Sequence, residues 1–169
     1  MNLKKIICWP PLLAGVGAGV TIGILAYITF QSILAGTNYG LWLAASFGSS
    51  VVVVFGYPDN EFAQPKNVLL GHLLCALIGI IFVTLFKITQ DRTIFFLTIG
   101  LAVGLSVMLM MALKITHPPA GGNTIVVMLT QDSFQFLIFP ILVGAITIII
   151  GGVIYNRIIL KKNYPLKWF

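Results

Sequence analysis

Residues 68–86 read VLLGHLLCALIGIIFVTLF, and they fall within a run of 20 residues, 67–86, that carries no formal charge. A helix needs about 20 mostly apolar residues to span the ~30 Å hydrocarbon core of a bilayer. Backbone inside hydrocarbon must satisfy its own hydrogen bonds, and a spanning strand would alternate in polarity, which this run does not. The run therefore predicts a transmembrane α-helix.

The remaining charges leave further gaps of spanning length. A gap of 53 residues separates Lys5 from Asp59, and the gaps 93–113, 115–131 and 133–156 hold 21, 17 and 24 residues. Hydrophobic residues make up 59% of the chain and charged residues 8%, with a mean hydropathy of +1.04, whereas soluble domains carry about 25% charged residues. The sequence predicts an all-α, polytopic transmembrane helical bundle that forms a single domain over residues 1–169.

The distribution of basic residues predicts how the chain is oriented. The net charge of +6 would favour nucleic-acid binding in a soluble protein, but four of the ten basic residues lie in 157–167 and two more are Lys4 and Lys5. Basic residues at both ends follow the positive-inside rule. We therefore expect a multi-pass protein of the plasma (inner) membrane with both termini in the cytoplasm, a lipid bilayer as its surroundings and no nucleic-acid partner.

Breaks in the apolar segments divide the chain into two similar halves. Four long segments, 12–35, 68–86, 94–113 and 136–159, alternate with two short ones that are rich in Gly, Pro and Ser, 41–57 and the stretch after Lys114. In the second short segment only residues 120–130 can form continuous helix, which is about half a bilayer. The order long, short, long occurs twice, so we predict pseudo-repeats at about 11–88 and 93–160.

The two short segments also align locally. Residues 48–54 read GSSVVVV and residues 121–127 read GGNTIVV, so each begins with glycine, continues with small or polar residues and ends in a β-branched run. Paired short, interrupted segments at corresponding places in two halves are typical of the substrate site of a transporter.

Two topologies fit these segments. If both short segments cross the membrane, the repeats are inverted, Lys66 and Lys114 lie inside, and Lys87 and Arg92 lie outside. If both short segments re-enter, four helices cross, the repeats are parallel and the two pairs exchange sides. The positive-inside rule does not choose between them, because each places eight basic residues inside. We favour six crossing elements, since 17 uncharged residues at 41–57 nearly suffice to span.

The second short segment begins at His117, Pro118 and Pro119, where a preceding helix cannot continue. The first N–H groups of the next helix, around 120–123, are expected to lack intrahelical partners and to carry the positive end of the helix dipole. Such a helix start binds anions. The predicted ligand-facing residues are therefore those at the starts of both short helices: His117, Pro118, Pro119, Gly121, Gly122 and Asn123 in the second, and Gly48, Ser49 and Ser50 in the first. The alternative is a helix cap near the lipid headgroups.

His72 and His117 are ionisable groups inside or beside membrane segments, where such groups mark functional sites by default. An unperturbed histidine exchanges a proton near neutral pH, so both are candidates for a proton partner or gate. His72 is equally well explained as a structural residue that caps Gln64 or Asn67. In the preceding loop, Gln64, Lys66 and Asn67 form either an ordinary solvated loop or the place where anions enter.

Other functions find little support in the sequence. It contains no metal-ligand cluster, nucleophile elbow or P-loop, and we expect no catalytic residue, no metal and no cofactor. Gly15 and Gly19 form a GxxxG motif, which serves either packing within the fold or self-association. A homo-oligomer is thus one option.

Three polar motifs in this order resemble a known family. They are Gln64-Pro65-Lys66-Asn67, Gly71-His72 and His117-Pro118-Pro119-Ala120-Gly121. Together they are similar to the HPP family of integral membrane proteins, over about residues 44–150. The family is described with four transmembrane segments, and its plant and cyanobacterial members are associated with nitrite transport. The usual family sequence after the tripeptide is Ala-Gly-Ala-Thr, and Gly122 and Asn123 differ from it. The resemblance therefore implies the fold more firmly than the substrate.

We therefore expect a transporter or channel for a small inorganic anion, with nitrite as the first candidate, bound near the bilayer midplane at the starts of the short helices. The alternatives are a non-transporting scaffold or accessory subunit and, least favoured, an intramembrane enzyme.

Overall fold

The computed structural model describes residues 9–34, 44–86 and 92–168, and the regular structure within these ranges is helical. The long helices are α1 (Trp9–Leu34), α3 (Pro65–Phe86), α4 (Arg92–Ala112) and α6 (Val143–Val153), the last flanked by the π-helical segments η4 (Leu137–Leu142) and η5 (Ile154–Ile159). The short helices are α2 (Ala44–Gly56) and α5 (Gly121–Thr130), and the 3-10 turns η2 (Glu61–Ala63) and η3 (Pro118–Ala120) precede α3 and α5.

Four of the described helices are long and apolar enough to cross a membrane: Pro11–Gln31, Pro65–Phe86, Ile94–Ala112 and Leu137–Ile159. The prediction of a polytopic helical bundle is confirmed, and the helices follow the predicted order of long, short, long in each half. The boundary between the repeats stays a prediction.

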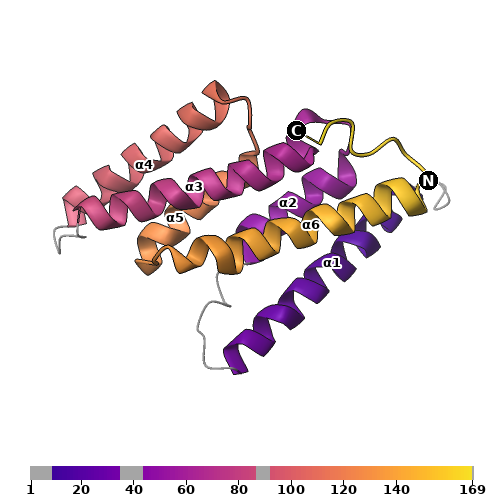
Figure 1. Ribbon diagram of the computed structural model, residues 1–169, viewed down its shortest axis with the longest axis horizontal. Helices are drawn as coiled ribbons and strands as arrows, with labels where there is room; N and C mark the ends of the chain where they lie inside the picture. Colours follow the sequence, from indigo (N-terminus) through magenta and orange to yellow (C-terminus); the bar gives the residue numbers. More distant parts are fainter. Residues whose placement is uncertain (1–8, 35–43, 87–91, 169) are drawn as a thin grey trace, which may run out of the picture.

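The short helices lie side by side with the long helix that ends the other half (Figure 1). A methyl group added at Gly79 of α3 would lie 2.9 Å from Val127 Cβ of α5. A methyl group added at Gly152 of α6 would overlap Val54 of α2. Small residues let helix backbones approach closely inside a membrane. Glycine at these places therefore permits the contact between the two halves.

Consecutive helices alternate in direction. Gly71 lies opposite Ala120 and Gly79 opposite Val127, so α5 runs parallel to α3, and equivalent contacts from Gly144 and Gly152 make α2 parallel to α6. Gly17 lies beside Tyr155, and Gly151 beside Thr21, so α1 and α6 are antiparallel. Each half thus reverses the order of directions of the other, as expected for inverted repeats with six crossing elements.

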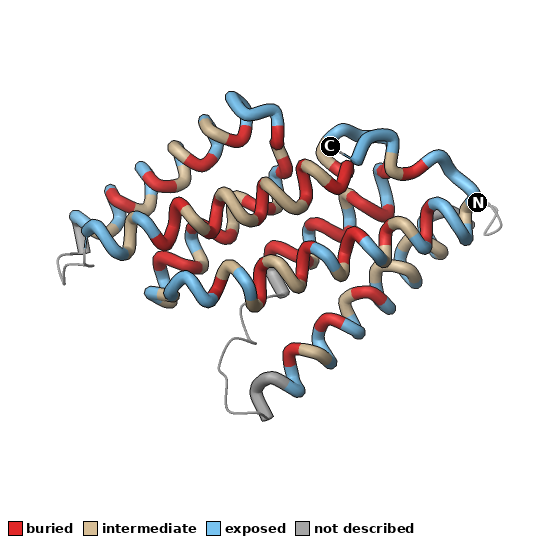
Figure 2. Tube along the Cα trace, in the orientation of Figure 1, coloured by how far each residue is buried: buried red, intermediate tan, exposed pale blue. Residues whose placement is uncertain are grey.

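The core of the bundle lies where α2, α3, α5 and α6 meet (Figure 2). Val54, Val68, Val127 and Ile148 have exposed fractions of 0% there. By contrast, α1 and α4 turn large apolar side chains outward, among them Val20, Tyr27, Phe96 and Leu101, each more than half exposed. Exposed apolar residues of this kind suit contact with lipid rather than water.

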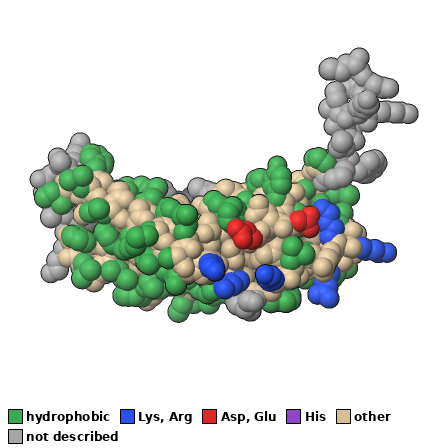
Figure 3. All heavy atoms as spheres, turned by 90° about the horizontal axis from the view of Figure 1, so that it is seen from above, with side chains coloured by type: hydrophobic (Ala, Val, Ile, Leu, Met, Phe, Trp, Pro, Cys, Tyr) green, Lys and Arg blue, Asp and Glu red, His purple; other side chains and the backbone are tan. Residues whose placement is uncertain are grey.

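One end of the bundle collects most of the described charges. The C-terminal segment folds back there: Leu166 N–H donates to Gln64 Oε1 (2.8 Å) and the Tyr164 hydroxyl donates to Ala63 O (2.8 Å). Burial raises the pKa of the Tyr164 phenol, so the hydroxyl stays protonated and keeps donating. Figure 3 shows Lys, Arg, Asp and Glu side chains gathered on the right-hand half of one face, with apolar side chains over much of the remainder.

Two details of the sequence prediction need correction. The helix start expected near Gly48 lies elsewhere, because α2 already includes Ala44 and Gly48 therefore sits inside the helix. Residues 41–43, where the predicted segment began, lie outside the described residues, as do Lys4, Lys5 and Lys87 of the charge argument. The last long segment is also not a regular α-helix, because Phe139 before Pro140 has extended backbone angles (φ −131°, ψ 112°).

Candidate functional site

Four of the predicted site residues meet in a buried polar cluster formed by Ser50 of α2, His72 of α3, His117 before η3 and Asn123 of α5. Ser50, His72 and His117 have exposed fractions of 0%, and that of Asn123 is 2%. Each side chain comes from a different segment, so the cluster exists only when both halves of the chain are folded together. We refer to these four residues as the histidine cluster.

His72 is held at both ring nitrogens. Its Nε2 lies 2.8 Å from Ser50 Oγ, and its Nδ1 lies 2.7 Å from Asn123 Nδ2. The ring of Phe47 covers it at a centroid distance of 4.8 Å. His72 therefore does not cap Gln64 or Asn67, but it is a hydrogen-bonded buried histidine, so its structural interpretation and its role in a pathway both stay open.

His117 is held in the same way. Its Nε2 lies 2.9 Å from Ser50 Oγ, and its Nδ1 lies 2.7 Å from the carbonyl oxygen of Phe62. The centroids of the two imidazole rings are 5.1 Å apart. Gly71 makes this approach possible, since a methyl group there would lie 2.9 Å from His117 Cβ.

The cluster contains no carboxylate. Among the described residues, no Asp, Glu, Lys or Arg forms a hydrogen bond or ion pair with either ring, and the titratable group that faces each histidine is the other histidine. A positive charge placed on the cluster would thus have no counter-charge from the described protein. Carrying such a charge inside a membrane is costly unless a partner compensates it.

The start of α5 differs from the expected anion site. Ala120 N–H donates to His117 O at 2.9 Å, and Gly121 N–H is bonded to the carbonyl oxygens of Pro118 and Pro119. The two prolines have no N–H to offer. The expectation of unpaired N–H groups is therefore wrong for Ala120 and Gly121, because the 3-10 turn η3 forms the first turn of the helix.

The first turns of α2 and α5 lie close together, while their convergence on an anion stays a prediction. An added methyl group at Gly122 would lie 3.8 Å from Ser46 Cβ. Gly48 and Gly121 are half-buried, with no described atom within 4 Å of an added Cβ. Ser49 is exposed, and its hydroxyl donates to Ser46 O at 2.9 Å. Ser49 therefore lies outside the histidine cluster, although its neighbour Ser50 is at the centre.

The loop residues Gln64 and Asn67 are engaged in structural hydrogen bonds. Gln64 Nε2 donates to the carbonyl oxygens of Pro58 and Asn60, and its Oε1 accepts from the C-terminal segment. Asn67 Nδ2 donates to Thr116 O at 3.0 Å, next to His117. These two amides hold the ends of the loops around the cluster. Lys66 is half-buried beside them, and its role in attracting anions stays a prediction.

Comparison with known proteins settles the family. The family described as HPP, transmembrane region, matches residues 5–165. This chain belongs to the HPP family. It is 34% identical over 131 residues to a transmembrane protein of Dictyostelium discoideum, covering 75% of this chain and 45% of the relative. A second Dictyostelium discoideum transmembrane protein is 29% identical over 152 residues, covering 88% of this chain and 48% of the relative.

This HPP-family chain thus spans less than half the length of these curated relatives. No solved structure matches it. The family resemblance was based on the tripeptide His117-Pro118-Pro119, and each part of it has a structural role. The histidine belongs to the histidine cluster, and the prolines form the first turn before α5.

Sequence reasoning missed three parts of the site. Phe62 contributes only a backbone carbonyl, for which no side-chain signal exists. Phe47 covers His72, but it reads as one more apolar residue of α2. Ser46 is the partner that could have been found, because a serine four residues before Ser50 lies on the same helix face.

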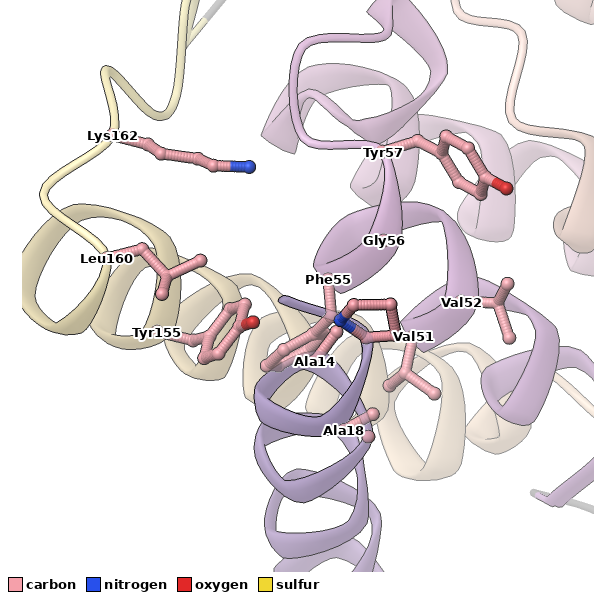
Figure 4. Close-up of a pocket in the computed structure, with 12 residues that line it drawn as sticks. Ala14, Ala18, Val51, Val52, Phe55, Gly56, Tyr57, Tyr155, Leu160 and Lys162 are labelled. Carbon is pink, nitrogen blue, oxygen red and sulfur yellow. The ribbon is translucent and has the colours of Figure 1, made fainter. Parts of the chain in front are cut away.

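A cavity of about 380 Å³ lies away from the histidine cluster, between α1, the end of α2 and the C-terminal part of the last helix. Figure 4 shows Lys162 and Tyr155 extending from the left toward the apolar side chains of Ala14 and Val51. The Tyr155 hydroxyl has no hydrogen-bond partner among the described residues. None of the predicted site residues lines this cavity, so in this HPP-family chain the cavity and the histidine cluster are separate features.

Proposed function

We propose that this protein moves a small inorganic anion across the membrane, with nitrite as the first candidate, and that the histidine cluster is where the anion is handled. The observation that carries the proposal is a fully buried pair of histidines bridged by Ser50, inside a predominantly apolar domain. Ionisable residues buried in a membrane domain are expensive and mark ion or proton pathways. A purely structural bundle would be more simply built from apolar residues at these positions.

The convergence of two short helices supports transport. Substrate sites of transporters built from inverted repeats lie between the repeats, at broken helices, and the cluster takes Ser50 from one short helix and Asn123 from the other. Side chains rather than free N–H groups would bind the anion there. Nitrite suits such a site because it is a compact hydrogen-bond acceptor whose charge would balance a protonated imidazole. We propose transport rather than catalysis.

We also propose how the protein is oriented and in which membrane it lies. The end that holds Lys114, Arg157 and the C-terminal segment would face the cytoplasm, in the plasma (inner) membrane, as the positive-inside rule predicts. In this closed arrangement both imidazoles are shielded from water. Transport would therefore require an opening movement of one half against the other.

The test is anion flux into proteoliposomes that contain the purified chain, comparing nitrite with nitrate, formate and chloride. We expect nitrite uptake above that of empty liposomes, and its loss in Ser50→Ala and His117→Ala at equal protein content. Ser106→Ala is the matched control, since Ser106 is equally buried but bonds Ala102 O and Thr124 instead. Absence of flux for all four anions, or equal loss in the control, would contradict the proposal.

A second candidate is a non-transporting subunit of a larger assembly. Gly15, Gly19 and Gly23 of α1 have no described atom within 4 Å of an added Cβ, so this face of α1 is available to another transmembrane helix, including one from a second copy. A subunit of this kind would show no flux alone, and its abundance in the membrane would depend on its partner.

A further inference from the structure

While both histidines are neutral, the Ser50 hydroxyl has more hydrogen-bond partners than it can use. Its oxygen lies 2.9 Å from Ser46 O, 2.8 Å from His72 Nε2 and 2.9 Å from His117 Nε2. A hydroxyl has one proton to donate and two lone pairs that accept. Ser46 O can only accept, whereas each imidazole nitrogen either donates or accepts. The protons in the cluster can therefore be assigned from its fixed ends.

Both ends are fixed. Phe62 O can only accept, so His117 Nδ1 carries a proton and donates to it. At the other end the Asn123 amide nitrogen lies 2.7 Å from His72 Nδ1 and 3.3 Å from the carbonyl oxygen of His72. A carbonyl oxygen can only accept, which orients the amide with its N–H groups toward His72. His72 Nδ1 therefore accepts and carries no proton.

With the hydrogen bonds at Phe62 and Asn123 fixed, only one arrangement of the protons is possible when both histidines are neutral. His72 carries its proton on Nε2 and donates to Ser50 Oγ. Ser50 donates in turn to His117 Nε2, which has no proton because Nδ1 holds it. Ser46 O does not need the Ser50 proton, since the Ser49 hydroxyl donates to it at 2.9 Å. The hydrogen bonds of the cluster then run in one direction, from Asn123 to Phe62.

We propose that the histidine cluster is a site for one additional proton, which binds at His117 Nε2 while the Ser50 hydroxyl rotates from His117 to Ser46 O. The proton comes from water when the cluster opens, and it adds to a lone pair without breaking a covalent bond. Ser50 Oγ then accepts N–H groups from both imidazoles, and its own proton has an acceptor 2.9 Å away. The groups that meet at Ser50 Oγ have hydrogen-bond partners in both states.

His117 takes this proton rather than His72. Protonation of His72 at Nδ1 would place its new N–H against the Asn123 amide nitrogen at 2.7 Å, which is also a donor. The amide would have to turn over and give up its contact with His72 O. Protonation of His117 needs only the rotation of one hydroxyl toward an acceptor already in place.

If the protein transports an anion as proposed, the protonated cluster would couple that transport to a proton. This coupling rests on the proposed function. The protonated cluster would be a buried cation without a carboxylate partner among the described residues. A small anion supplies the missing counter-charge, so one anion and one proton would move together. The proton site itself does not depend on transport.

The test is ¹⁵N NMR of histidine-labelled protein in liposomes, assigned with His72→Gln and His117→Gln, without any substrate. Near neutral pH we expect His72 protonated on Nε2 and His117 on Nδ1. On acidification His117 should become doubly protonated while His72 keeps its tautomer. In Ser50→Ala the doubly protonated fraction of His117 at a given acidic pH should fall by about tenfold, because the cation loses an acceptor. Thr124→Val, next to Asn123 but outside the cluster, should change neither histidine.

Opposite tautomers, or His72 charging before His117, would overturn the proton site whatever the flux assay shows. The expected tautomers without anion flux would leave the proton site standing and remove the transport function. Flux that does not increase when an inward proton gradient is applied, together with the expected tautomers, would remove only the coupling.

Discussion

Ser50 and Asn123 bond the two opposite ring nitrogens of His72, at 2.8 Å and 2.7 Å. They occupy equivalent places in the two halves, since residue 50 and residue 123 align when 48–54 is laid on 121–127. The burial of Val51 to Val54 also matches that of Thr124 to Val127, residue by residue. Each half thus places one polar residue of its short helix on the same imidazole.

The same sequence offset relates the glycines that seat the short helices. Gly71 and Gly79 of α3 correspond to Gly144 and Gly152 of the last helix by the shift that carries residue 48 onto residue 121. Their contacts correspond as well: Gly79 faces Val127, and Gly152 faces Val54. The internal repeat is therefore visible in packing as well as in helix order.

Gly79→Ala and Gly152→Ala should destabilise the protein to a similar degree, by about 1–3 kcal/mol each, because the added methyl groups overlap the facing short helix. Gly100→Ala in α4 is the control, as no described atom lies within 4 Å of its added Cβ. Unfolding in mixed detergent micelles measures all three. If the control is destabilised as much as the other two, the effect is not one of helix contact.

The sequence predicts most of this fold because apolar length and charge spacing determine which segments span a bilayer. Predicted residues 68–86 and 94–113 agree with α3 and α4 to within three residues. The prediction for α5 is equally close, since Pro118 and Pro119 limit where a helix can begin. The start of α2 is predicted less well, because Gly48 and the serines interrupt the hydropathy without interrupting the helix.

The sequence identifies the four side chains of the histidine cluster but not the bonds between them, and their role in binding a substrate stays a prediction. Polar residues in apolar segments stand out, so Ser50, His72, His117 and Asn123 could be named in advance. Which groups bond one another depends on packing between distant segments, as between Gly71 and His117. The N–H groups of Ala120 and Gly121 were expected to be free because the 3-10 turn before α5 cannot be read from the sequence.

A second polar network should prove structural. Thr124 Oγ1 donates to Cys75 O at 2.9 Å and bonds Ser106 Oγ at 2.8 Å, which ties α5 to α3 and α4. Thr124→Val keeps the shape and removes these bonds, and hydrogen bonds between membrane helices average about 0.6 kcal/mol. We expect a loss of stability of about that size and normal anion flux. Loss of flux at unchanged stability would instead place Thr124 in the transport path.

Tyr164 should make the protein sensitive to alkali. Burial raises the pKa of its phenol above the ordinary value of about 10, so the folded state holds this proton more tightly than the unfolded state. The stabilisation is complete below about pH 10 and is lost as the pH rises further. Tyr164→Phe should cost about 1 kcal/mol near neutral pH through the lost bond to Ala63 O. Unfolding measured from pH 9 to 11 should show a smaller decline for the variant than for the unaltered protein.

Thiol labelling from each side of the membrane distinguishes the two topologies. In a Cys8→Ser background, Lys114→Cys, Ser133→Cys and Asn163→Cys each place one thiol at an exposed loop position, while Cys75 is buried. With six crossing elements, positions 114 and 163 share one side and position 133 lies on the other. The structure favours this result, because Asn67 bonds Thr116 O and Gln64 bonds Leu166 N–H at a single end of the bundle. With re-entrant short segments, position 114 would instead react together with position 133. We expect an impermeant maleimide to reach 114 and 163 only from the cytoplasmic side, and labelling of 114 and 133 from the same side would contradict the inverted repeat.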